Sequence, residues 1–251
     1  MAVNNYIRSG ILTVSELVMG FNKRILFVTA TRREAVGAGI LAESSSREGV
    51  DHVPLAIKGV DAHLLVTGVG MTATAFALGK HLALNSYDLV INLGIAGSLH
   101  PDLALAEVVN VIDDCFADLG AEDNGQFLSI QQMGLIQPND KPFIDGRVKS
   151  NLDKRMIPSD LRNVSGITVN KVTGSAESIA LCKSVYPHAA IESMEGAAFF
   201  YSCLLSGLPC MQLRAISNVV EPRNRNNWKI PEALDSLARV VQNWIPLLQN
   251  V

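Results

Sequence analysis

Residues 24–30 read RILFVTA and residues 88–94 read DLVINLG, two short apolar runs that are each followed by polar or glycine residues. Runs of this length and composition are typical of strands that are buried on both faces. Such strands belong to parallel or mixed sheets that are covered by helices on each side. The two stretches therefore predict an α/β fold.

Outward from these stretches, strand-like runs alternate with helical patterns. Residues 53–60 and 62–70 predict a pair of strands joined near residues 59–61. Further strands are expected at 106–113, 167–174, 190–194 and 209–217, and helices at 71–84, 195–207 and 231–248. The alternation predicts a three-layer αβα single domain over residues 23–251, with a central mixed, largely parallel twisted sheet. Residues 115–160 show no clear periodicity and are expected to be rich in loops.

The composition limits the class of protein. The 251 residues are 48% hydrophobic and 18% charged, which is enough apolar material for a sizeable core. A net charge of −3 argues against nucleic acid as a partner. No apolar run is long enough to span a membrane. Because the four cysteines and five histidines show no metal-ligand spacing, we expect no metal, no cofactor and a cytoplasmic location.

Residues 1–22 differ from the rest of the chain. They lack the basic region, the long apolar region and the cleavage site of a signal peptide. The folded part is expected to begin at Lys23, with residues 1–22 as a poorly anchored N-terminal extension.

Ligand sites in open α/β sheets gather at the carboxyl ends of the strands. The residues that follow the predicted strands are therefore candidates for a site: 31–34, 68–72, 94–97, 173–177, 194–196 and 217–218. Among them are Glu34, after the first strand, and Glu195, at the start of an apolar helix. Taken alone, Glu34 could be a solvated charge and Glu195 a first-turn acid favoured by the helix dipole. Their occurrence with Asn218 at strand ends favours a shared site.

The stretch GVGMTA at residues 68–73 has the form of a dinucleotide-binding turn. The acid that should hold the ribose would be Asp88. However, Asp88 precedes its strand, whereas an acid in that role follows one. Since glycines also suit a tight strand-to-helix turn, we favour that interpretation over an NAD-dependent oxidoreductase.

Four segments of the chain resemble the purine nucleoside phosphorylase and nucleosidase superfamily: VTGVGMTATA (66–75), VINLGIAGSL (90–99), ESMEGAA (192–198) and RAISNVVEPRNRNNW (214–228). The resemblance runs from about Arg24 to the C-terminus. It is strongest to the branch that contains methylthioadenosine/S-adenosylhomocysteine nucleosidase and futalosine hydrolase. The last two segments are most like futalosine hydrolase. The resemblance implies the same αβα fold and a nucleosidase activity.

The resemblance also implies roles for single residues. Glu34 falls on the carboxylate that activates the attacking water, and Glu195 on the carboxylate that holds the ribose hydroxyls. Met194 falls on a residue that packs against the sugar, and Trp228 on an aromatic that covers the 5′ substituent. The remaining expected substrate-binding residues are Gly70, Ile95, Ala96 and Gly97.

Asn218 falls on the acid that protonates the purine N7 in adenine-releasing relatives, and residues 173–178 lack the aromatic that usually stacks on adenine. An Asn amide can donate to a 6-oxo oxygen while its own oxygen accepts from a protonated N7. Both departures weaken an adenine-specific interpretation, and Asn218 favours hypoxanthine or guanine, although it could also cap a loop. Arg223 and Arg225, close to Trp228, either bind an aryl carboxylate such as that of futalosine or are solvated loop charges.

These features predict hydrolysis of the N-ribosidic bond of a 6-oxopurine nucleoside. The best match is futalosine, cleaved to hypoxanthine and dehypoxanthine futalosine in menaquinone biosynthesis, and the residues do not separate it from its aminodeoxy relative. Asn92 and Ile95 stand where hexameric phosphorylases carry an arginine and a serine for phosphate, which favours water as the nucleophile. The alternatives are a phosphate-dependent 6-oxopurine nucleoside phosphorylase, a methylthioadenosine/S-adenosylhomocysteine nucleosidase and a nucleotide-binding regulatory module. We expect a homodimer or higher homo-oligomer.

Overall fold

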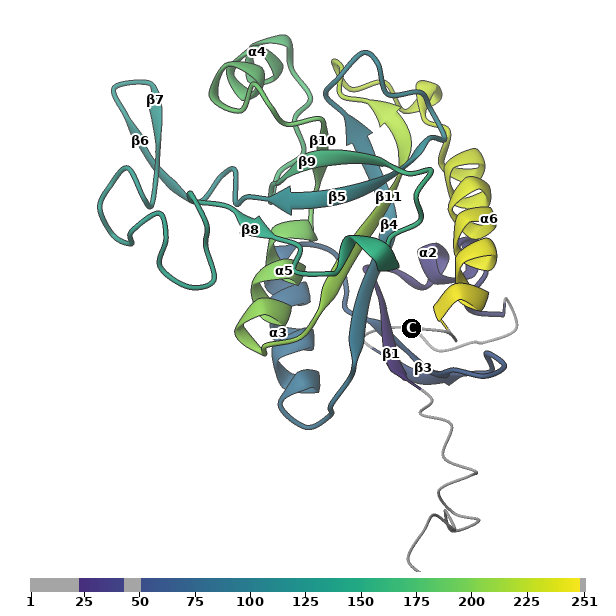
Figure 1. Cartoon of the computed structure of the whole chain (residues 1–251). Helices are drawn as coiled ribbons and strands as arrows, with labels where there is room; N and C mark the ends of the chain where they lie inside the picture. The colour runs from purple at the N-terminus through teal and green to yellow at the C-terminus, as the bar shows by residue number, and fades with distance from the viewer. Residues whose placement is uncertain (1–22, 43–50, 249–251) are drawn as a thin grey trace, which may run out of the picture.

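Successive side chains of β1 (Arg24–Thr29) point to opposite faces of a sheet, and both faces are buried. Ile25 and Phe27 pack into one hydrophobic core, and Leu26 and Val28 into another. This alternation is the period of two that a strand imposes on its side chains. The computed structural model describes residues 23–42 and 51–248, in which the sheet lies between two layers of helices (Figure 1). The predicted three-layer αβα fold is confirmed.

In the described residues, nine strands form one mixed sheet. Besides β1 they are β2 (Asp51–Leu55), β3 (Asp61–Val66), β4 (Leu89–Ser98), β5 (Val108–Asp114), β8 (Val148–Lys149), β9 (Arg162–Thr168), β10 (Ile191–Ser193) and β11 (Cys210–Val219). A separate hairpin consists of β6 (Gly120–Asp123) and β7 (Gln126–Ser129). The helices are α2 (Arg32–Gly37), α3 (Met71–Leu82), α4 (Ala176–Val185), α5 (Gly196–Leu205) and α6 (Ile230–Leu248), with short 3-10 turns η1 (Lys154–Met156) and η2 (Arg225–Asn227).

The strand order across the sheet is β10-β9-β5-β11-β4-β1-β3-β2, and β8 pairs with β5. β4 pairs in parallel with β1 and β11, and near its end Gly97 and Ser98 also pair antiparallel with β10. Since β10 stands at the far end of the order, the strands from β4 through β11, β5 and β9 to β10 close into a ring. This closure brings the end of β10 beside the second half of β4.

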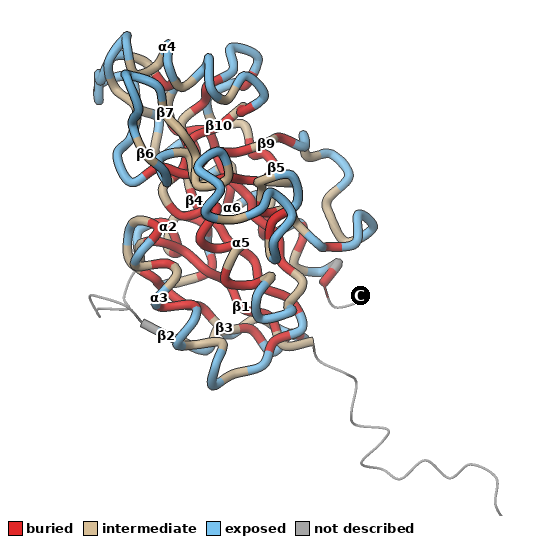
Figure 2. The backbone as a smooth tube through the Cα atoms, turned by 90° about the vertical axis from the view of Figure 1, so that its left-hand side faces the viewer, coloured by how far each residue is buried: buried red, intermediate tan, exposed pale blue. Residues whose placement is uncertain are grey.

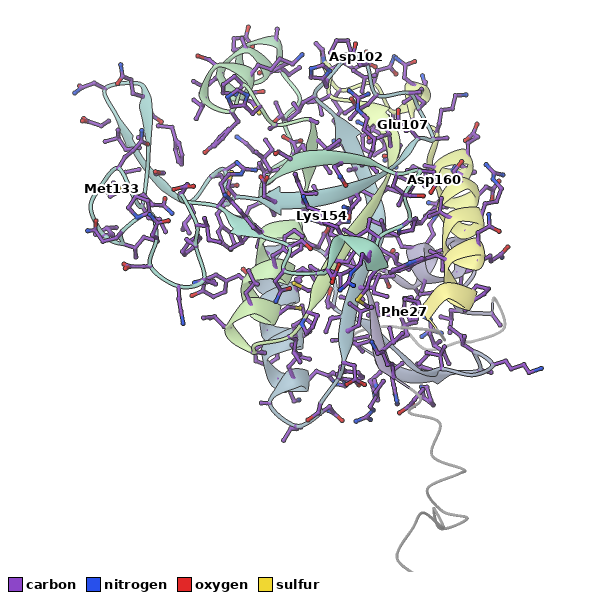
Figure 3. All side chains as sticks on the ribbon, viewed as in Figure 1. Phe27, Asp102, Glu107, Met133, Lys154 and Asp160 are labelled. Carbon is purple, nitrogen blue, oxygen red and sulfur yellow. The ribbon has the colours of Figure 1, made fainter. Side chains whose placement is uncertain are left out.

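Helices α2 and α6 cover one face of the sheet, and α3 and α5 cover the other (Figure 1). The core beneath α6 includes Phe27 and Trp244, and the core beneath α5 includes Phe199 and Phe200. Figure 2 shows that the buried residues concentrate in the sheet and the helix faces next to it. Met133 lies in a long excursion away from the sheet, beyond the β6–β7 hairpin (Figure 3). None of the helices in residues 23–42 and 51–248 is long and apolar enough to cross a membrane.

The strand predicted at residues 167–174 differs from the structure, because β9 ends at Thr168 and residues 169–174 are irregular. The neighbouring strand β10 ends at Ser193, and the last bond to it is the one that the N–H of Val169 donates to the Ser193 carbonyl. The next N–H, that of Asn170, donates to the Asp118 carboxylate. The pair of strands expected around residues 59–61 is confirmed by β2 and β3, which run antiparallel.

No sequence pattern predicts α4, because it lacks a buried apolar stripe and contains no fully buried residue. The available signal was local: Ser175 and Ser178 form a capping box at its start. The segment expected to be rich in loops, residues 115–160, contains β6, β7, β8 and η1 joined by irregular backbone. The predicted N-terminal extension, residues 1–22, lies outside the described residues.

Candidate active site

A cavity of about 270 Å³ lies where β1, β4, β10 and β11 end. The residues that line it come from these strand ends and from the helices and turns that follow them. Eight of the residues predicted from the sequence are among them: Glu34, Ile95, Ala96, Gly97, Met194, Glu195, Asn218 and Trp228. The structure therefore brings the predicted strand-end residues together at one site.

Three predicted residues lie outside the wall of this cavity. Gly70 lies behind it, and its N–H donates to Oε1 of Glu195 at 3.0 Å. Arg223 lines a smaller neighbouring cavity of about 60 Å³ together with Trp228. The guanidinium of Arg225 lies 5.8 Å from the Trp228 ring centre, and that of Arg223 lies 5.2 Å from it. Arg225 lines neither cavity, so Arg223 is the better placed of the two arginines.

Glu34 is held by the local structure at the start of α2. Thr31 and Glu34 form a capping box, the signature T-x-x-E, in which Oε2 of Glu34 accepts from the N–H and the hydroxyl of Thr31, each at 3.0 Å. Oε1 accepts from the N–H of Ile95 at 3.2 Å. Only 8% of Glu34 is exposed. The alternative that Glu34 is a solvated charge is therefore wrong.

Glu195 is the N-cap of α5 and is also buried, but its side chain makes no capping hydrogen bond to its own helix. Its Oε1 accepts from Gly70, and its Oε2 lies 3.6 Å from Nη1 of Arg214. Gly70 has a φ of 94°, a left-handed conformation that favours glycine and turns its N–H toward the carboxylate. Interaction with the helix dipole alone does not explain contacts to two other elements.

Arg214, which was not among the residues predicted from the sequence, lies in β11 and is 1% exposed. Its Nη1 lies beside Glu195 and donates to the Ile95 carbonyl at 3.4 Å. A Cβ on Gly94 would collide with Nη1 of Arg214 and lie 2.7 Å from Oε1 of Glu34, so this close approach requires glycine. The signal in the sequence was an arginine inside the apolar run PCMQLRAIS, because a buried arginine needs partners.

The three charged groups determine the electrostatics of the site. Burial raises the pKa of Glu34, and the nearby Glu195 raises it further. Arg214 and the hydrogen bonds from Ile95 and Thr31 act in the opposite direction but do not cancel this effect. A raised pKa makes the ionised Glu34 carboxylate a stronger base, which suits it to accept a proton.

Asn218 lies on the side of the site that adjoins the smaller cavity, whose wall includes Asn218, Glu192 and Trp228 but neither Glu34 nor Glu195. Oδ1 of Asn218 accepts from the Ser217 hydroxyl at 2.9 Å, and Nδ2 donates to the Val219 carbonyl at 3.0 Å. A bulge between Ile216 and Asn218 interrupts the pairing of β11 with β4 at this point. The site thus has a charged end and an amide end.

Glu192 is a second carboxylate on the side of Asn218. It is 5% exposed and lines both cavities. Its Oε1 accepts from the N–H of Thr173 at 2.9 Å, and its Oε2 accepts from the Thr173 hydroxyl. Burial raises the pKa of Glu192. In the sequence, Glu192 belongs to the ESMEGAA segment, but no pattern there predicted a role for it.

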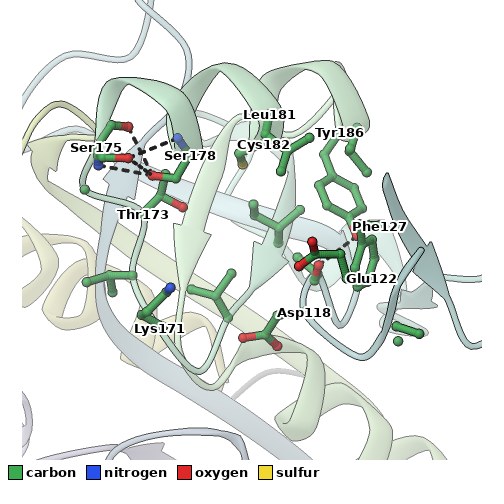
Figure 4. Close-up of a pocket in the computed structure, with 18 residues that line it drawn as sticks. Asp118, Glu122, Phe127, Lys171, Thr173, Ser175, Ser178, Leu181, Cys182 and Tyr186 are labelled. Carbon is green, nitrogen blue, oxygen red and sulfur yellow. Dashed lines mark hydrogen bonds between the residues drawn. The ribbon is translucent and has the colours of Figure 1, made fainter. Parts of the chain in front are cut away.

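A larger cavity of about 600 Å³ lies between the β6–β7 hairpin and α4 (Figure 4). Phe127 and Tyr186 lie on one side of it, and Lys171 near its other end (Figure 4). It shares Val172 with the site but includes none of the converging groups around Arg214. We therefore expect the reaction to take place in the cavity of about 270 Å³, where the charged side chains meet.

Two other kinds of site can be compared with the structure. Within residues 23–42 and 51–248, no cluster of three His, Cys, Asp or Glu side chains could hold a metal ion. Asp88, the acid of the dinucleotide alternative, precedes β4 and accepts from the N–H of Arg24 at 2.8 Å. It lies at the opposite end of the strands from the cavity, so it cannot hold a ribose there.

Two buried carboxylates thus flank one buried arginine at the strand ends of an αβα sheet. Such groups can bind a sugar, activate a nucleophile and stabilise charge on a leaving base. The chain belongs to the phosphorylase superfamily, which its residues 52–250 match.

The chain is similar in sequence to two kinds of nucleosidase. The chain is 32% identical over 197 residues to futalosine hydrolase of Streptomyces coelicolor, a match that covers 74% of this chain and 80% of the relative. It is 32% identical over 225 residues to futalosine hydrolase of Acidothermus cellulolyticus, covering 87% and 88%. Identity to the 5′-methylthioadenosine/S-adenosylhomocysteine nucleosidase of Staphylococcus aureus is 25% over 162 residues, covering 63% and 70%.

Solved structures show the same fold. The methylthioadenosine/S-adenosylhomocysteine nucleosidase of Neisseria meningitidis, in complex with methylthio-immucillin-A, superposes with a TM-score of 0.72 at 17% identity and covers 89% of this chain and 98% of that one. Futalosine hydrolase of Helicobacter pylori superposes with a TM-score of 0.71 at 16% identity, covering 90% and 98%. The predicted nucleosidase-like architecture is confirmed.

Proposed function

We propose that this chain hydrolyses the N-ribosidic bond of a 6-oxopurine nucleoside and that its substrate is futalosine, which yields hypoxanthine. The observation that carries this proposal is the placement of Glu34 and Glu195 around Arg214 in a cavity whose other end presents Asn218. The two futalosine hydrolases that are 32% identical over most of their length support the choice of substrate.

Cleavage of this bond builds positive charge on the ribose as the base departs. Glu195 is held by Gly70 and Arg214 with its carboxylate at the cavity wall, where it can accept hydrogen bonds from ribose hydroxyls. A negative charge fixed beside the developing cation stabilises the transition state more than the ground state. Glu195 is therefore the ribose-binding group of the proposal.

Glu34 is the proposed general base. Burial brings the pKa of Glu34 closer to neutral pH, which makes the carboxylate a better base. Its contacts with Thr31 and Ile95 fix the direction of the carboxylate. A water molecule bound to Glu34 would lose a proton to it while attacking the anomeric carbon of the sugar. The bond between the sugar and the base breaks with its electron pair on the base, which takes up a proton from solvent and leaves as hypoxanthine. The proton of the attacking water stays on Glu34, and the oxygen becomes the new hydroxyl of the sugar product.

Water suits this site better than phosphate. A phosphate ion needs cationic or N–H donors that converge on it. The buried cation at the site, Arg214, is already paired with Glu195 and lies close to Glu34. A dianion would have to approach two carboxylates, which favours hydrolysis over phosphorolysis.

Two groups on the side of Asn218 suit a 6-oxopurine. The Asn218 amide can donate to the 6-oxo oxygen and accept from a protonated N7. Glu192 can accept from N1, which carries a hydrogen in hypoxanthine and none in adenine. With adenine, the carboxylate would face the N1 lone pair. Both groups therefore disfavour the methylthioadenosine/S-adenosylhomocysteine nucleosidase alternative, which the fold similarity alone leaves open.

The 5′ side of the nucleoside is assigned to Trp228 and Arg223. The two side chains stack as a cation–π pair with 5.2 Å between the guanidinium and the ring centre. An aromatic face next to a guanidinium matches an aryl group with a carboxylate, which is what futalosine carries at this position. Arg225 stacks on the same ring at 5.8 Å but lines neither cavity, so the carboxylate contact is assigned to Arg223.

The proposal is tested by incubating the protein with futalosine, aminodeoxyfutalosine, inosine and methylthioadenosine, each with and without phosphate. The released base and sugar are identified by mass. We expect hypoxanthine from futalosine at a rate that does not depend on phosphate. Release of ribose 1-phosphate derivatives would show a phosphorylase, and preferred release of adenine from methylthioadenosine would show the other nucleosidase.

A further inference from the structure

A line of polar side chains crosses the otherwise apolar layer between the sheet and α5. Alternate residues of β11 face this layer, and between the apolar Cys210 and Ile216 these are Gln212 and Arg214. Asp114, at the end of β5, reaches the same place. Gln212 and Asp114 have no exposed surface and Arg214 has 1%. Polar groups buried this completely are retained only when they are hydrogen-bonded.

The line is a continuous chain of hydrogen bonds that ends at the active site. Nε of Arg214 donates to Oε1 of Gln212 at 2.9 Å, and Nε2 of Gln212 donates to Oδ2 of Asp114 at 3.3 Å. At its other end, Arg214 lies 3.6 Å from Glu195. The bond to Gln212 is the shortest that Arg214 makes, since its bond to the Ile95 carbonyl is 3.4 Å long. Nη2 of Arg214 has no hydrogen-bond partner within the part of the chain described.

We propose that Gln212 and Asp114 are positioning residues that hold the Arg214 guanidinium between Glu34 and Glu195. The inference rests on the proposed function, in which those two carboxylates act on the ribose and the water. Because the tip of Arg214 is only loosely bonded, its orientation depends on the Nε bond to Gln212. Asp114 does not touch the cavity and acts through Gln212.

The direction of each hydrogen bond is fixed by Asp114. Its Oδ1 accepts from the N–H of Cys115 at 2.8 Å and from the Thr168 hydroxyl at 2.9 Å, and its Oδ2 accepts from Gln212. At pH 7, above its raised pKa of about 6, the Asp114 carboxylate is ionised and only accepts, so it forces Gln212 to present its NH₂ group to Asp114 and its oxygen to Arg214. The opposite orientation of the Gln212 amide would place two donors against each other at Arg214.

The same carboxylate supports the start of α5, which carries Glu195. The N–H of Ala197 donates to the Thr168 hydroxyl at 2.8 Å, and that hydroxyl donates to Asp114. At Gly196 there is no room for a side chain, since a Cβ would collide with Oδ2 of Asp114 and Oε1 of Gln212. The chain of hydrogen bonds therefore passes directly beneath the residue that follows Glu195 and sets the positions of both Arg214 and Glu195.

Exchange of the two side-chain types tests the direction of the bonds. In Asp114→Asn, the fixed N–H of Cys115 keeps the amide oxygen, so the new NH₂ group faces that of Gln212. One hydrogen bond of the chain is lost, and kcat should fall about ten- to a hundredfold with KM within about threefold of wild type. In the double variant Asp114→Asn/Gln212→Glu, the new amide at position 114 donates to the new carboxylate at position 212, and that carboxylate accepts from Arg214. This variant should recover to within about threefold of the wild-type kcat.

The matched control is Asp113→Asn, the same substitution one residue away. Asp113 pairs with Arg147 and Ser165 and not with Gln212, so kcat should stay within about twofold of wild type. If the double variant is no faster than Asp114→Asn, or Asp113→Asn is equally slow, the positioning role is wrong. All variants are assayed on whichever nucleoside the wild type cleaves.

A second readout does not depend on turnover. The Nε–H of Arg214 should give a slowly exchanging ¹H–¹⁵N signal, assigned by its loss in Arg214→Lys. In Asp114→Asn we expect the Nε–H of Arg214 to exchange rapidly with water, so that its signal disappears. In the double variant the slowly exchanging signal should return. Absence of activity on all four nucleosides would contradict the proposed function alone. An unchanged Arg214 signal in Asp114→Asn would contradict the positioning role alone.

Discussion

Oε2 of Glu195 lies 3.6 Å from Nη1 of Arg214, and both side chains are buried. Removal of one partner from a buried ion pair costs about 3–5 kcal/mol, because the remaining charge loses its partner without gaining water. Arg214 also lies near Glu34, so one cation balances two carboxylates. The charge at this site is thus maintained at a cost in stability, which is typical of functional groups.

Glu195→Gln should lower kcat and raise KM for ribonucleosides, because the neutral amide binds the ribose hydroxyls less strongly and does not stabilise the cationic sugar. Removal of one charge-assisted hydrogen bond predicts a loss of about 1.5–3 kcal/mol in kcat/KM, or about ten- to a hundredfold. A 2′-deoxynucleoside should be affected less than the ribonucleoside. Equal kinetic constants in variant and wild type would show that Glu195 only caps α5.

Glu34→Gln should keep substrate affinity and lower kcat by about 10²–10⁴-fold, the usual contribution of a general base. The amide oxygen can still accept from Thr31, so the start of α2 should persist, whereas the NH₂ group faces the N–H of Ile95 and that bond is lost. Single-turnover base release gives kcat, and equilibrium dialysis gives the affinity. A rate close to that of the wild type would remove Glu34 from the mechanism.

The fully buried carboxyl of Asp114 should make stability depend on pH. Burial raises the pKa of Asp114 from 3.8 to about 6, against the hydrogen bonds from Thr168 and Gln212 and the charges of Arg147 and Arg214. Between these two values the folded state keeps a proton that the unfolded state has released. The contribution of Asp114 to the free energy of unfolding is therefore largest below pH 3.8 and is lost as the pH rises through about 6.

The size of this effect follows from the shift of roughly two pKa units, at about 1.4 kcal/mol per unit, or about 3 kcal/mol in total. In Asp114→Asn the position no longer titrates. The difference in unfolding free energy between wild type and variant should therefore change by about 2 kcal/mol between pH 4 and pH 7, in favour of the variant at pH 7, because part of the total is already lost at pH 4. Urea denaturation at both pH values measures it, and a constant difference would show that Asp114 titrates normally.

The buried strands β1 and β4 could be predicted because each is a continuous apolar run followed by polar or glycine residues. The closure of the ring could not. It depends on the pairing of Gly97 and Ser98 with β10, a strand of three residues whose sequence has no distinctive period. Helix α4 was not predicted for a related reason, since its side chains lie half exposed around the large cavity instead of forming an apolar stripe.

The candidate site was predicted from the rule that sites gather at the carboxyl ends of parallel strands, and this rule does not explain the residues that follow β10. The residues after β1 meet those in the last part of β4 and β11 because these strands are parallel, as the strand-end rule requires, although β4 and β11 extend past the ends predicted for them. β10 runs antiparallel to β4, and Met194 and Glu195 reach the site because the sheet closes. Arg214 was missed because its alternation with apolar neighbours is a normal strand pattern until its partners Gln212 and Glu195 are seen in space.

Arg223→Ala should reduce kcat/KM for futalosine more than for inosine, because only futalosine has a carboxylate on its 5′ substituent. Loss of one charge-assisted contact predicts about a tenfold to hundredfold effect on the ratio. Arg225→Ala is the matched control. Its guanidinium stacks on the same Trp228 ring but lines neither cavity, so it should change the ratio less. If neither variant changes the ratio of the two substrates, the arginines do not bind the carboxylate.

Asn218→Asp should narrow or reverse the preference for 6-oxopurines. In the wild type, the Asn218 amide can satisfy a 6-oxo oxygen and a protonated N7, whereas a 6-amino group leaves a buried donor or acceptor unpaired. That mismatch costs about 1–3 kcal/mol, or roughly ten- to a hundredfold in kcat/KM. An Asp in this place would face the Val219 carbonyl that now accepts from Nδ2, which favours its protonated form. A protonated carboxyl can donate to N7 and accept from a 6-amino group.

The measurement is kcat/KM for futalosine and for its 6-amino counterpart, in wild type and in Asn218→Asp. Asn224→Asp is the matched control, because it is the same substitution six residues away and Asn224 caps η2 through Oδ1, a bond that an aspartate also makes. The ratio of kcat/KM for futalosine to kcat/KM for its 6-amino counterpart should change in Asn218→Asp and stay at the wild-type value in Asn224→Asp. A ratio that is equal in all three proteins, or a wild type that prefers the 6-amino substrate, would mean that Asn218 does not read the base. Since Glu192 lies beside it in both cavities, selectivity that survives in Asn218→Asp but is lost in Glu192→Gln would assign base recognition to the carboxylate at N1.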